Sequence, residues 1–171
     1  MDWIVREAHE TDAERLALIG SAIFLETFAG ILDGAAIVAH CGTAHDAATY
    51  RASLRDGAAA WLGETAEGRS PIGYALAAPA ALPGAQAGDL ELKRIYLLSR
   101  FHGGGLGAEL MRRAVGWAMR RGARRLLLGV YAGNARAIAF YRKQGFEPIA
   151  DRRFRVGDRD YDDVVLARPL S

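Results

Sequence analysis

Residues 90–108, LELKRIYLLSRFHGGGLGA, join an apolar strand pattern to a glycine-rich turn and the start of a helix. The first N–H groups of a helix lack partners within it, and the helix dipole favours negative charge beside them. Glycines let the backbone wrap an anion because no Cβ stands in the way. The pattern predicts a cradle for a phosphate or pyrophosphate, although three glycines in a row also make a flexible turn without any ligand.

Two common phosphate-binding patterns fit this turn poorly. A P-loop carries a Lys and a hydroxyl residue at its end, and neither follows Gly107. A dinucleotide fingerprint can be placed on Gly103, Gly105 and Ala108, but it requires an acidic residue at the end of the next strand. That strand ends at Tyr131 without a carboxylate. A nucleotide-cofactor oxidoreductase therefore stays only as a weak alternative.

Hydrophobic spacing along the rest of the chain alternates between the periods of a strand and a helix. A capping box between Thr11 and Glu14 is expected to open the first helix, and Gly145 to stop the last one. The order predicts one α/β domain over residues 1–171, a mixed sheet of six to seven strands flanked by about four helices. Strands are expected over 3–8, 59–64, 72–79, 89–98, 126–131, 146–156 and 161–167, with Gly157-Asp158 between the last two; helices are expected up to Phe28, once or twice within 33–56, and over 105–121 and 134–144.

Composition limits the class of protein. A single cysteine, Cys41, permits no internal disulfide, which is typical of a reducing cytoplasm. No apolar run approaches the ~20 residues of a membrane span, and the N-terminal residues lack the pattern of a secretory signal. We therefore expect a soluble cytoplasmic protein without a membrane partner. The 4 histidines show no metal-ligand spacing, so no metal is expected.

Charge is divided unevenly along the chain. Residues 1–90 carry 5 basic and 12 acidic side chains, whereas residues 91–171 carry 17 and 8. The first part can attract a cation and the second a polyanion. Six arginines in the second part suggest a nucleic-acid surface, but aromatic side chains do not alternate with them as stacking requires, so nucleic acid is not an expected partner. These are Arg112, Arg113, Arg120, Arg121, Arg124 and Arg125.

From residue 90 to 145 the sequence resembles the GCN5-related N-acetyltransferase (GNAT) superfamily. The pyrophosphate loop of that family, Gln/Arg-x-x-Gly-x-Gly/Ala, falls here on His102-x-x-Gly105-x-Gly107. A second family signature falls on NARA (134–137), FY (140–141) and GF (145–146). LELKRIYL (90–97), LGVYAGNARAIAFYRKQGF (128–146) and TF (27–28) are, more narrowly, similar to PaiA-type polyamine acetyltransferases. His102 departs from the family's Gln or Arg, which removes a fixed positive charge.

The resemblance implies a GNAT-like fold in which a neutral amine attacks the thioester of acetyl-CoA directly. Tyr141 is expected to act as general acid, since a phenol with a pKa of about 10 can protonate the departing thiolate. Its alternative is a core residue. Glu91 is expected to act as base, and its alternative is an ion pair with Lys93 or Arg94.

The same resemblance assigns the cofactor-binding residues. Three residues of the strand are expected along the pantetheine arm, with the Leu97 N–H facing the thioester oxygen. The turn is expected at the pyrophosphate, and two residues of the last helix near the pantetheine. The full set is Ile95, Tyr96 and Leu97; His102, Gly103, Gly104, Gly105, Leu106, Gly107 and Ala108; and Asn134 and Tyr141.

The acceptor is the open question. The resemblance and the acidic first part favour a polyamine or another small amine, with Glu26, Asp33 and Asp46 as candidates to meet its positive charge. A protein N-terminus, an amino acid and an aminoglycoside-like amine are the alternative acceptors. A non-catalytic CoA-sensing regulator is the alternative function. The sequence also leaves a homodimer open.

Overall fold

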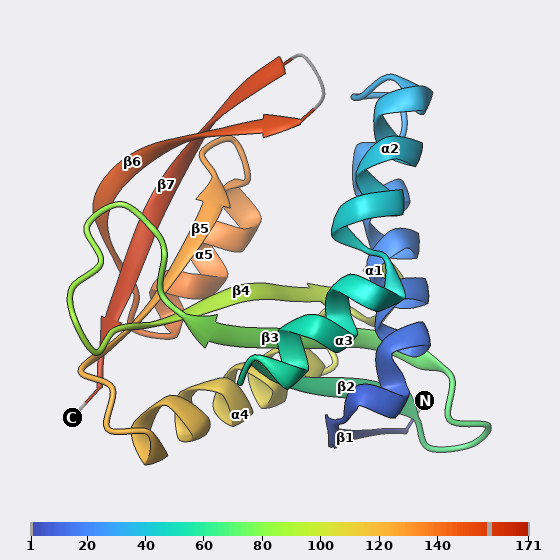
Figure 1. Cartoon of the computed structure of the whole chain (residues 1–171), viewed down its shortest axis with the longest axis horizontal. Coiled ribbons are helices and arrows are strands. Elements are labelled where there is room, and N and C mark those ends of the chain that lie inside the picture. Colours follow the sequence, from blue (N-terminus) through green and yellow to red (C-terminus); the bar gives the residue numbers. More distant parts are fainter. Residues whose placement is uncertain (1, 157–158, 171) are drawn as a thin grey trace. The chain divides into compact units, whose positions relative to one another are not determined.

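The computed structural model describes residues 2–156 and 159–170, so the predicted Gly157-Asp158 turn lies outside the described residues. In this part of the chain seven strands form one mixed sheet in the order β1-β2-β3-β4-β5-β7-β6 (Figure 1). β4 and β5 run parallel, and the pairs β1–β2, β5–β7 and β6–β7 run antiparallel. The strands are β1 (Trp3–Ala8), β2 (Ala59–Thr65), β3 (Pro71–Pro79), β4 (Leu90–Leu97), β5 (Arg125–Tyr131), β6 (Glu147–Val156) and β7 (Arg159–Pro169).

Five α-helices and two short 3₁₀ turns occur among the described residues, and the expected α/β architecture with a mixed sheet is confirmed. The region 33–56 holds two helices, because Asp33 and Asp46 each cap a helix start. None of the described helices combines the length and the apolar character that crossing a membrane requires. The helices are α1 (Ala13–Phe28), α2 (Gly34–Ala44), α3 (Ala47–Arg55), α4 (Leu106–Arg120) and α5 (Ala135–Lys143), and the 3₁₀ turns are η1 (Glu10–Asp12) and η2 (Ser99–Phe101).

The chain is built from two compact units. The first comprises Met1–Leu76 and Arg94–Ala114, and the second comprises Ala77–Lys93 and Val115–Ser171. The boundary crosses β3, β4 and α4, so each of these elements contributes to both units.

The first unit has its core between α1 and the sheet. Leu16, Ile19 and Ile23 recur at helical spacing and pack in one buried cluster with Leu62 of β2 and Tyr74 of β3. α4 packs on the next residue of β2, because a Cβ placed on Gly63 would lie 2.8 Å from Cδ1 of Leu106. Leu106, the first residue of α4, is fully buried. The helix that follows the glycine-rich turn therefore starts against the sheet.

The predicted capping box between Thr11 and Glu14 is wrong. Both side chains are exposed, and the turn η1 precedes α1. The carboxylate of Asp12 accepts a hydrogen bond from the backbone N–H of His9 at 3.0 Å and two more from Arg6 at 2.9 and 2.7 Å. An ionised carboxylate held by an arginine is a stronger hydrogen-bond acceptor for the backbone N–H groups before α1 than a threonine hydroxyl is. The hydrogen bond from Arg6 lowers the pKa of Asp12 to about 2.

The second unit is organised by β7. It pairs with β5 along the whole of that strand, from Arg125–Pro169 to Tyr131–Asp163, and with β6 on its other side. Leu126 and Leu127 are both fully buried, as expected of a strand covered on both faces. α5 ends at Lys143, and Gln144 is its C-cap. Gly145 follows with a left-handed φ of 84°, so the helix ends at the glycine that the sequence predicted as its C-terminal signal.

Candidate functional site

The glycine-rich turn lies in the first unit and requires its glycines. Gly103 and Gly105 have φ of 83° and 84°, a region that residues with a Cβ rarely adopt. The indole Nε1 of Trp3 in β1 donates to Gly104 O at 3.1 Å, and a Cβ on Gly105 would lie 3.7 Å from Cζ2 of the same indole. Trp3 therefore contacts the turn at two of its glycines and fixes its path into α4.

The start of α4 offers unpaired donors. Its first backbone hydrogen bond runs from Glu109 N to Gly105 O at 3.1 Å. Within the part of the chain that the structure describes, the N–H groups of Leu106, Gly107 and Ala108 have no acceptor. Three such donors at the positive end of a helix, beside a backbone without side chains, form a site suited to a phosphate group. The residues expected at the pyrophosphate are thus brought together.

His102 ties the turn to the end of β4. Its Nε2 lies 3.2 Å from the backbone oxygen of Leu97, which can only accept, so the Nε2–H donates. In the neutral ring the remaining Nδ1 is an acceptor, and it becomes a donor only in the imidazolium. The expected donation from His102 to a phosphate therefore requires the charged ring, whereas the neutral ring serves to position Leu97.

The end of β4 directs one backbone donor away from β3. Leu98 N donates to Ile72 O of β3 at 3.0 Å. Alternation along an extended chain turns the preceding N–H, that of Leu97, toward the opposite edge. The parallel ladder of β4 with β5 consists of the pairs Leu90–Leu126 and Glu91–Leu127 and ends before Leu97. This orientation is the one that the expected contact of the Leu97 N–H with a thioester oxygen needs.

The other two expected pantetheine contacts lie on opposite faces of β4. Ile95 is buried, whereas Tyr96 is 41% exposed, with its ring 5.9 Å from that of Tyr74. A Cβ on Gly73 would lie 2.8 Å from Tyr96 O, so β3 approaches the backbone of β4 closely at this point. The end of β4 and the glycine-rich turn thus form one continuous piece of the first unit.

Glu91, the expected base, belongs to the second unit. Its carboxylate is buried, and Oε2 accepts from Ala81 N at 3.0 Å and lies 3.4 Å from Lys93 Nζ. Of the two ion pairs considered from the sequence, the one with Lys93 is present. These contacts show that Glu91 holds the segment before β4 in place, whatever chemistry it performs.

Asn134 and Tyr141 also belong to the second unit, at the start and near the end of α5. The Asn134 side-chain oxygen accepts from Ala137 N at 3.0 Å, so the amide nitrogen is the part of that side chain oriented for a ligand. The Tyr141 ring is buried and packs edge-on against Phe140 and Phe146, at 5.5 and 6.0 Å between centroids. Packing thus fixes the ring, which suits both the core and the acid interpretation.

The three carboxylates expected to meet a cationic acceptor are used by the fold. Glu26 accepts from Ser99 N at 2.9 Å and from Ser99 Oγ at 2.8 Å, which holds α1 to the segment after β4. Asp33 caps α2 by accepting from Ala35 N at 2.9 Å. Asp46 caps α3 by accepting from the backbone N–H of residue 48 at 3.0 Å. The positions of Asp33 and Asp46 therefore reflect helix capping, and that of Glu26 reflects a contact between two segments of the fold.

A buried polar cluster in the first unit was missed by the sequence reasoning. His45 Nδ1 lies 2.8 Å from the Tyr50 hydroxyl, which lies 2.7 Å from the Tyr74 hydroxyl. The Arg94 guanidinium lies over the Tyr50 ring, 5.2 Å from its centroid. Burial, followed by the charge of Arg94, lowers the pKa of His45 to about 3. The spacing of these residues in the sequence carries no signal for the cluster, because only the fold brings the side chains together.

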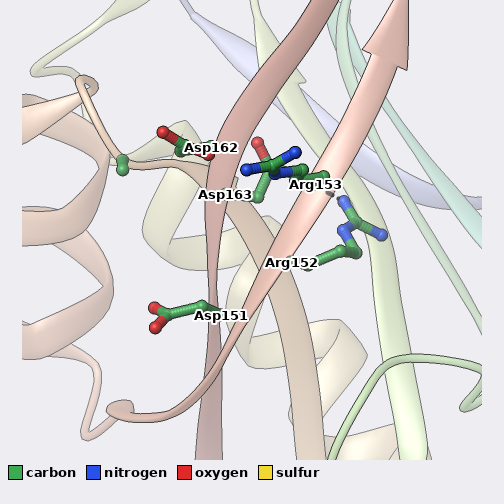
Figure 2. A pocket seen from close by; sticks show the side chains of 6 residues that line it. Asp151, Arg152, Arg153, Asp162 and Asp163 are labelled. Atoms are coloured by element: carbon green, nitrogen blue, oxygen red, sulfur yellow. Dashed lines mark hydrogen bonds and ion pairs between the residues drawn. The ribbon is translucent and has the colours of Figure 1, made fainter.

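The β6–β7 hairpin of the second unit carries an open pocket of about 410 Å³ (Figure 2). Arg152 pairs with Asp163 at 2.6 Å, while Asp151 points in the opposite direction from Arg152. The described residues contain no group of three or more His, Cys, Asp or Glu side chains placed to hold a metal. The pocket is lined by Ala132, Asp151, Arg152, Arg153, Asp162 and Asp163.

Known proteins match the chain over most of its length. A relative, an uncharacterized N-acetyltransferase of Mycobacterium tuberculosis, is 35% identical over 164 residues, which are 94% of this chain and 99% of the relative. The PaiA N-acetyltransferase of Thermoplasma acidophilum, solved with coenzyme A, has a TM-score of 0.78 and 19% identity over 99% of both chains. YncA of Salmonella typhimurium, solved with its cofactor acetyl-CoA, has a TM-score of 0.72 and 22% identity, covering 100% of this chain and 95% of that one.

The two solved structures share the fold, and their low identities carry no more than that. The family model for the acetyltransferase (GNAT) family matches residues 26–146, which is more than half of the chain. This segment contains the glycine-rich turn, the end of β4 and α5. With this match and the relative that spans almost the whole sequence, the chain belongs to the acetyltransferase (GNAT) family.

Proposed function

We propose that this protein moves an acetyl group from acetyl-CoA to a small primary amine by direct attack of the neutral amine on the thioester. Family membership supports the reaction class. The observation that carries the proposal is the turn itself, where Gly103 and Gly105 take left-handed φ angles and three N–H groups of α4 lack acceptors. A pyrophosphate with several negative charges fits that backbone better than a neutral ligand. The proposed acetyltransferase domain covers residues 1–171.

Each chemical requirement of the reaction has a proposed residue. The N–H groups of 106–108 bind the pyrophosphate, and the Leu97 N–H donates to the thioester oxygen as negative charge develops on it. The amide nitrogen of Asn134 donates to the pantetheine arm. Tyr141 gives its proton to the departing thiolate, and the amine loses its proton to Glu91. The attack forms the C–N bond, and collapse of the oxyanion breaks the C–S bond.

Release of the CoA thiol, measured over a panel of amines, tests the function. The panel contains polyamines, amino acids, an aminoglycoside and a peptide with a free N-terminus, and at least one of them is expected to accelerate thiol release well above hydrolysis. Binding is measured in parallel as the rise in melting temperature with acetyl-CoA and with NAD. A rise with acetyl-CoA but no turnover with any amine would support the CoA-sensing regulator instead. A rise in melting temperature with NAD alone would support the nucleotide-cofactor oxidoreductase.

Glu91 as base is tested with Glu91→Gln. An amide oxygen still accepts from Ala81 N, so the fold is kept while the basic group is removed. If Glu91 accepts the proton, kcat/KM of the variant drops by about 10²-fold or more while the Kd for acetyl-CoA is kept. An unchanged kcat/KM would leave Glu91 with its structural contacts alone.

Gly105→Val is expected to weaken acetyl-CoA binding by about 10-fold or more. A β-branched residue at φ of 84° pays roughly 1–2 kcal/mol of backbone strain, and relief of that strain distorts the turn. Titration calorimetry with acetyl-CoA measures the effect. Gly122→Val is the matched control, because Gly122 has φ of 70° at the other end of α4 and no atom within 4 Å of an added Cβ. Equal affinities of the two variants for acetyl-CoA would show that the turn does not bind the cofactor.

A further inference from the structure

Arg94 is a half-buried cation on the inner face of β4. Its side chain points toward α3 of the first unit, because the guanidinium lies over the ring of a tyrosine on that helix. The guanidinium carbon lies 5.2 Å above the ring of Tyr50, which is fully buried and hydrogen bonded to Tyr74 and His45. The surroundings are therefore aromatic side chains whose hydroxyl and imidazole groups are hydrogen bonded to one another.

This cation has no carboxylate partner among the described residues. Ion pairs with nitrogen–oxygen distances up to 4.0 Å join the other half-buried arginines of the first unit to an acid: Arg6 to Asp12, Arg51 to Glu14 and Arg113 to Glu109. No such pair includes Arg94. A cation–π contact and a hydrogen bond with the Tyr50 side chain offset part of the desolvation cost, and the remaining N–H donors of the guanidinium match a carboxylate in geometry.

Four titratable neighbours of Arg94 supply no counter-charge near pH 7. His40 and His45 both have pKa values lowered by burial first and by Arg94 second, so both rings are neutral near pH 7. Burial raises the pKa of Tyr50 and of Tyr74, so their phenols also stay neutral. The cluster as a whole thus carries one uncompensated positive charge. A site of this charge repels a polyamine and attracts an anion.

The position of Arg94 relates this charge to the proposed chemistry. It precedes Leu97 by three residues of the same strand, a separation of about 10 Å at 3.3 Å per residue. A molecule of amino-acid size, together with the reach of the arginine side chain, spans that distance. On the basis of the proposed function, we propose that Arg94 binds a carboxylate of the acceptor, and that the acceptor is a primary amine carrying a carboxylate, as amino acids do.

The use of Glu26, Asp33 and Asp46 in the fold agrees with this acceptor. Each of these carboxylates already accepts backbone hydrogen bonds, so none of the three candidates is a free anionic group of the kind that a polycation needs. An amino acid instead offers its carboxylate to Arg94 and, once its ammonium group has lost a proton, its neutral amine to the thioester. The similarity to PaiA is a likeness of fold at 19% identity and does not decide between these acceptors.

Matched pairs of amines test the proposal. Each pair consists of an amino acid and the amine left when its carboxylate is removed, such as lysine with cadaverine and phenylalanine with phenethylamine. The wild-type protein is expected to use the amino acids with kcat/KM at least about 10-fold above their partners. Charge-assisted hydrogen bonds worth about 1.5–3 kcal/mol correspond to a 10- to 150-fold loss of that preference in Arg94→Gln. Arg94→Lys is expected to restore part of it.

Arg55→Gln is the control, because it removes an equal charge from an exposed position of the same unit. Binding is also followed without turnover, as the rise in melting temperature of CoA-loaded protein with each amine. Stabilisation by amino acids that Arg94→Gln abolishes supports the proposal even if thiol release is absent, in which case only the proposed function fails. The proposal would be overturned if the wild-type protein preferred polyamines, or if Arg94→Gln raised only the KM for acetyl-CoA. It would also be overturned if Arg94→Gln lowered kcat/KM equally for both members of each pair.

Discussion

Tyr141→Phe is expected to lower kcat by about 10²- to 10⁴-fold while the Kd for acetyl-CoA changes by less than about twofold. The substitution removes one hydroxyl and leaves the ring, so the edge-on packing with Phe140 and Phe146 is kept. A thiolate that leaves without a proton donor carries its full negative charge in the transition state, and the loss therefore falls on turnover and not on binding. Steady-state kinetics with the best amine of the panel and calorimetry with acetyl-CoA measure the two quantities.

Tyr161→Phe is the matched control for this experiment. The Tyr161 hydroxyl is buried and has no hydrogen-bond partner among the described residues, so its removal is expected to leave kcat unchanged. If Tyr141→Phe retained full turnover while the chemical step limits the rate, Tyr141 would be a core residue and the acid would have to be sought elsewhere. Pre-steady-state thiol release establishes whether the chemical step is limiting.

Most of the fold follows from local patterns in the sequence. The strand at Trp3–Ala8 has the predicted bounds, and α1, α4 and α5 lie within a residue or two of prediction, because strong hydrophobic periodicity decides these elements. The entry to α1 was mispredicted for a physical reason. Thr11 and Glu14 satisfy the capping pattern locally, but Asp12 reaches Arg6, a partner in β1 that no local pattern indicates.

The cofactor side of the site was more accessible to sequence reasoning than the acceptor side. Positive φ is a local property of glycine, so residue types predicted a turn before a helix start at His102 to Ala108. The assignment of this turn to a cofactor came from the resemblance to the family. Recognition of the acceptor depends on groups distant in sequence. Asp33 and Asp46 carry the signature of N-caps, an acidic residue directly before a helix, and that local signal explains them better than the charge of the region does.

The cluster around Arg94 shows why the acceptor side of the site could not be predicted from the sequence. His45 directly follows α2, Tyr50 lies on α3 and Tyr74 on β3, and only folding brings the three side chains within hydrogen-bond distance. Nothing in the spacing of these residues predicts that a histidine will be neutral or an arginine unpaired. Both properties arise from burial, which depends on the packing of α1 and α3 against the sheet. The most informative features for specificity are therefore the non-local ones.

The free energy of unfolding is expected to fall by about 3–5 kcal/mol as the pH decreases from 7 to 3, with His45 as the main cause. Burial holds the pKa of folded His45 at about 3, while the unfolded value is about 6.5. Below pH 6.5 the unfolded chain binds a proton that the folded chain excludes, so acid favours unfolding over this whole range. Asp12, with a folded pKa of about 2, adds its loss only below about pH 4.

Denaturant unfolding at intervals between pH 7 and pH 4 measures this slope. His45→Gln is expected to remove most of it, because glutamine can still hydrogen bond to Tyr50 and has no proton to gain. His9→Gln, at an exposed position, is the control and is expected to keep the wild-type slope. An unchanged slope in His45→Gln would show that the ring is already accessible to protons. The charge of Arg94 contributes to the low pKa of His45. An anion bound at Arg94 is therefore expected to reduce the dependence of the free energy of unfolding on pH, which links this measurement to the proposed acceptor site.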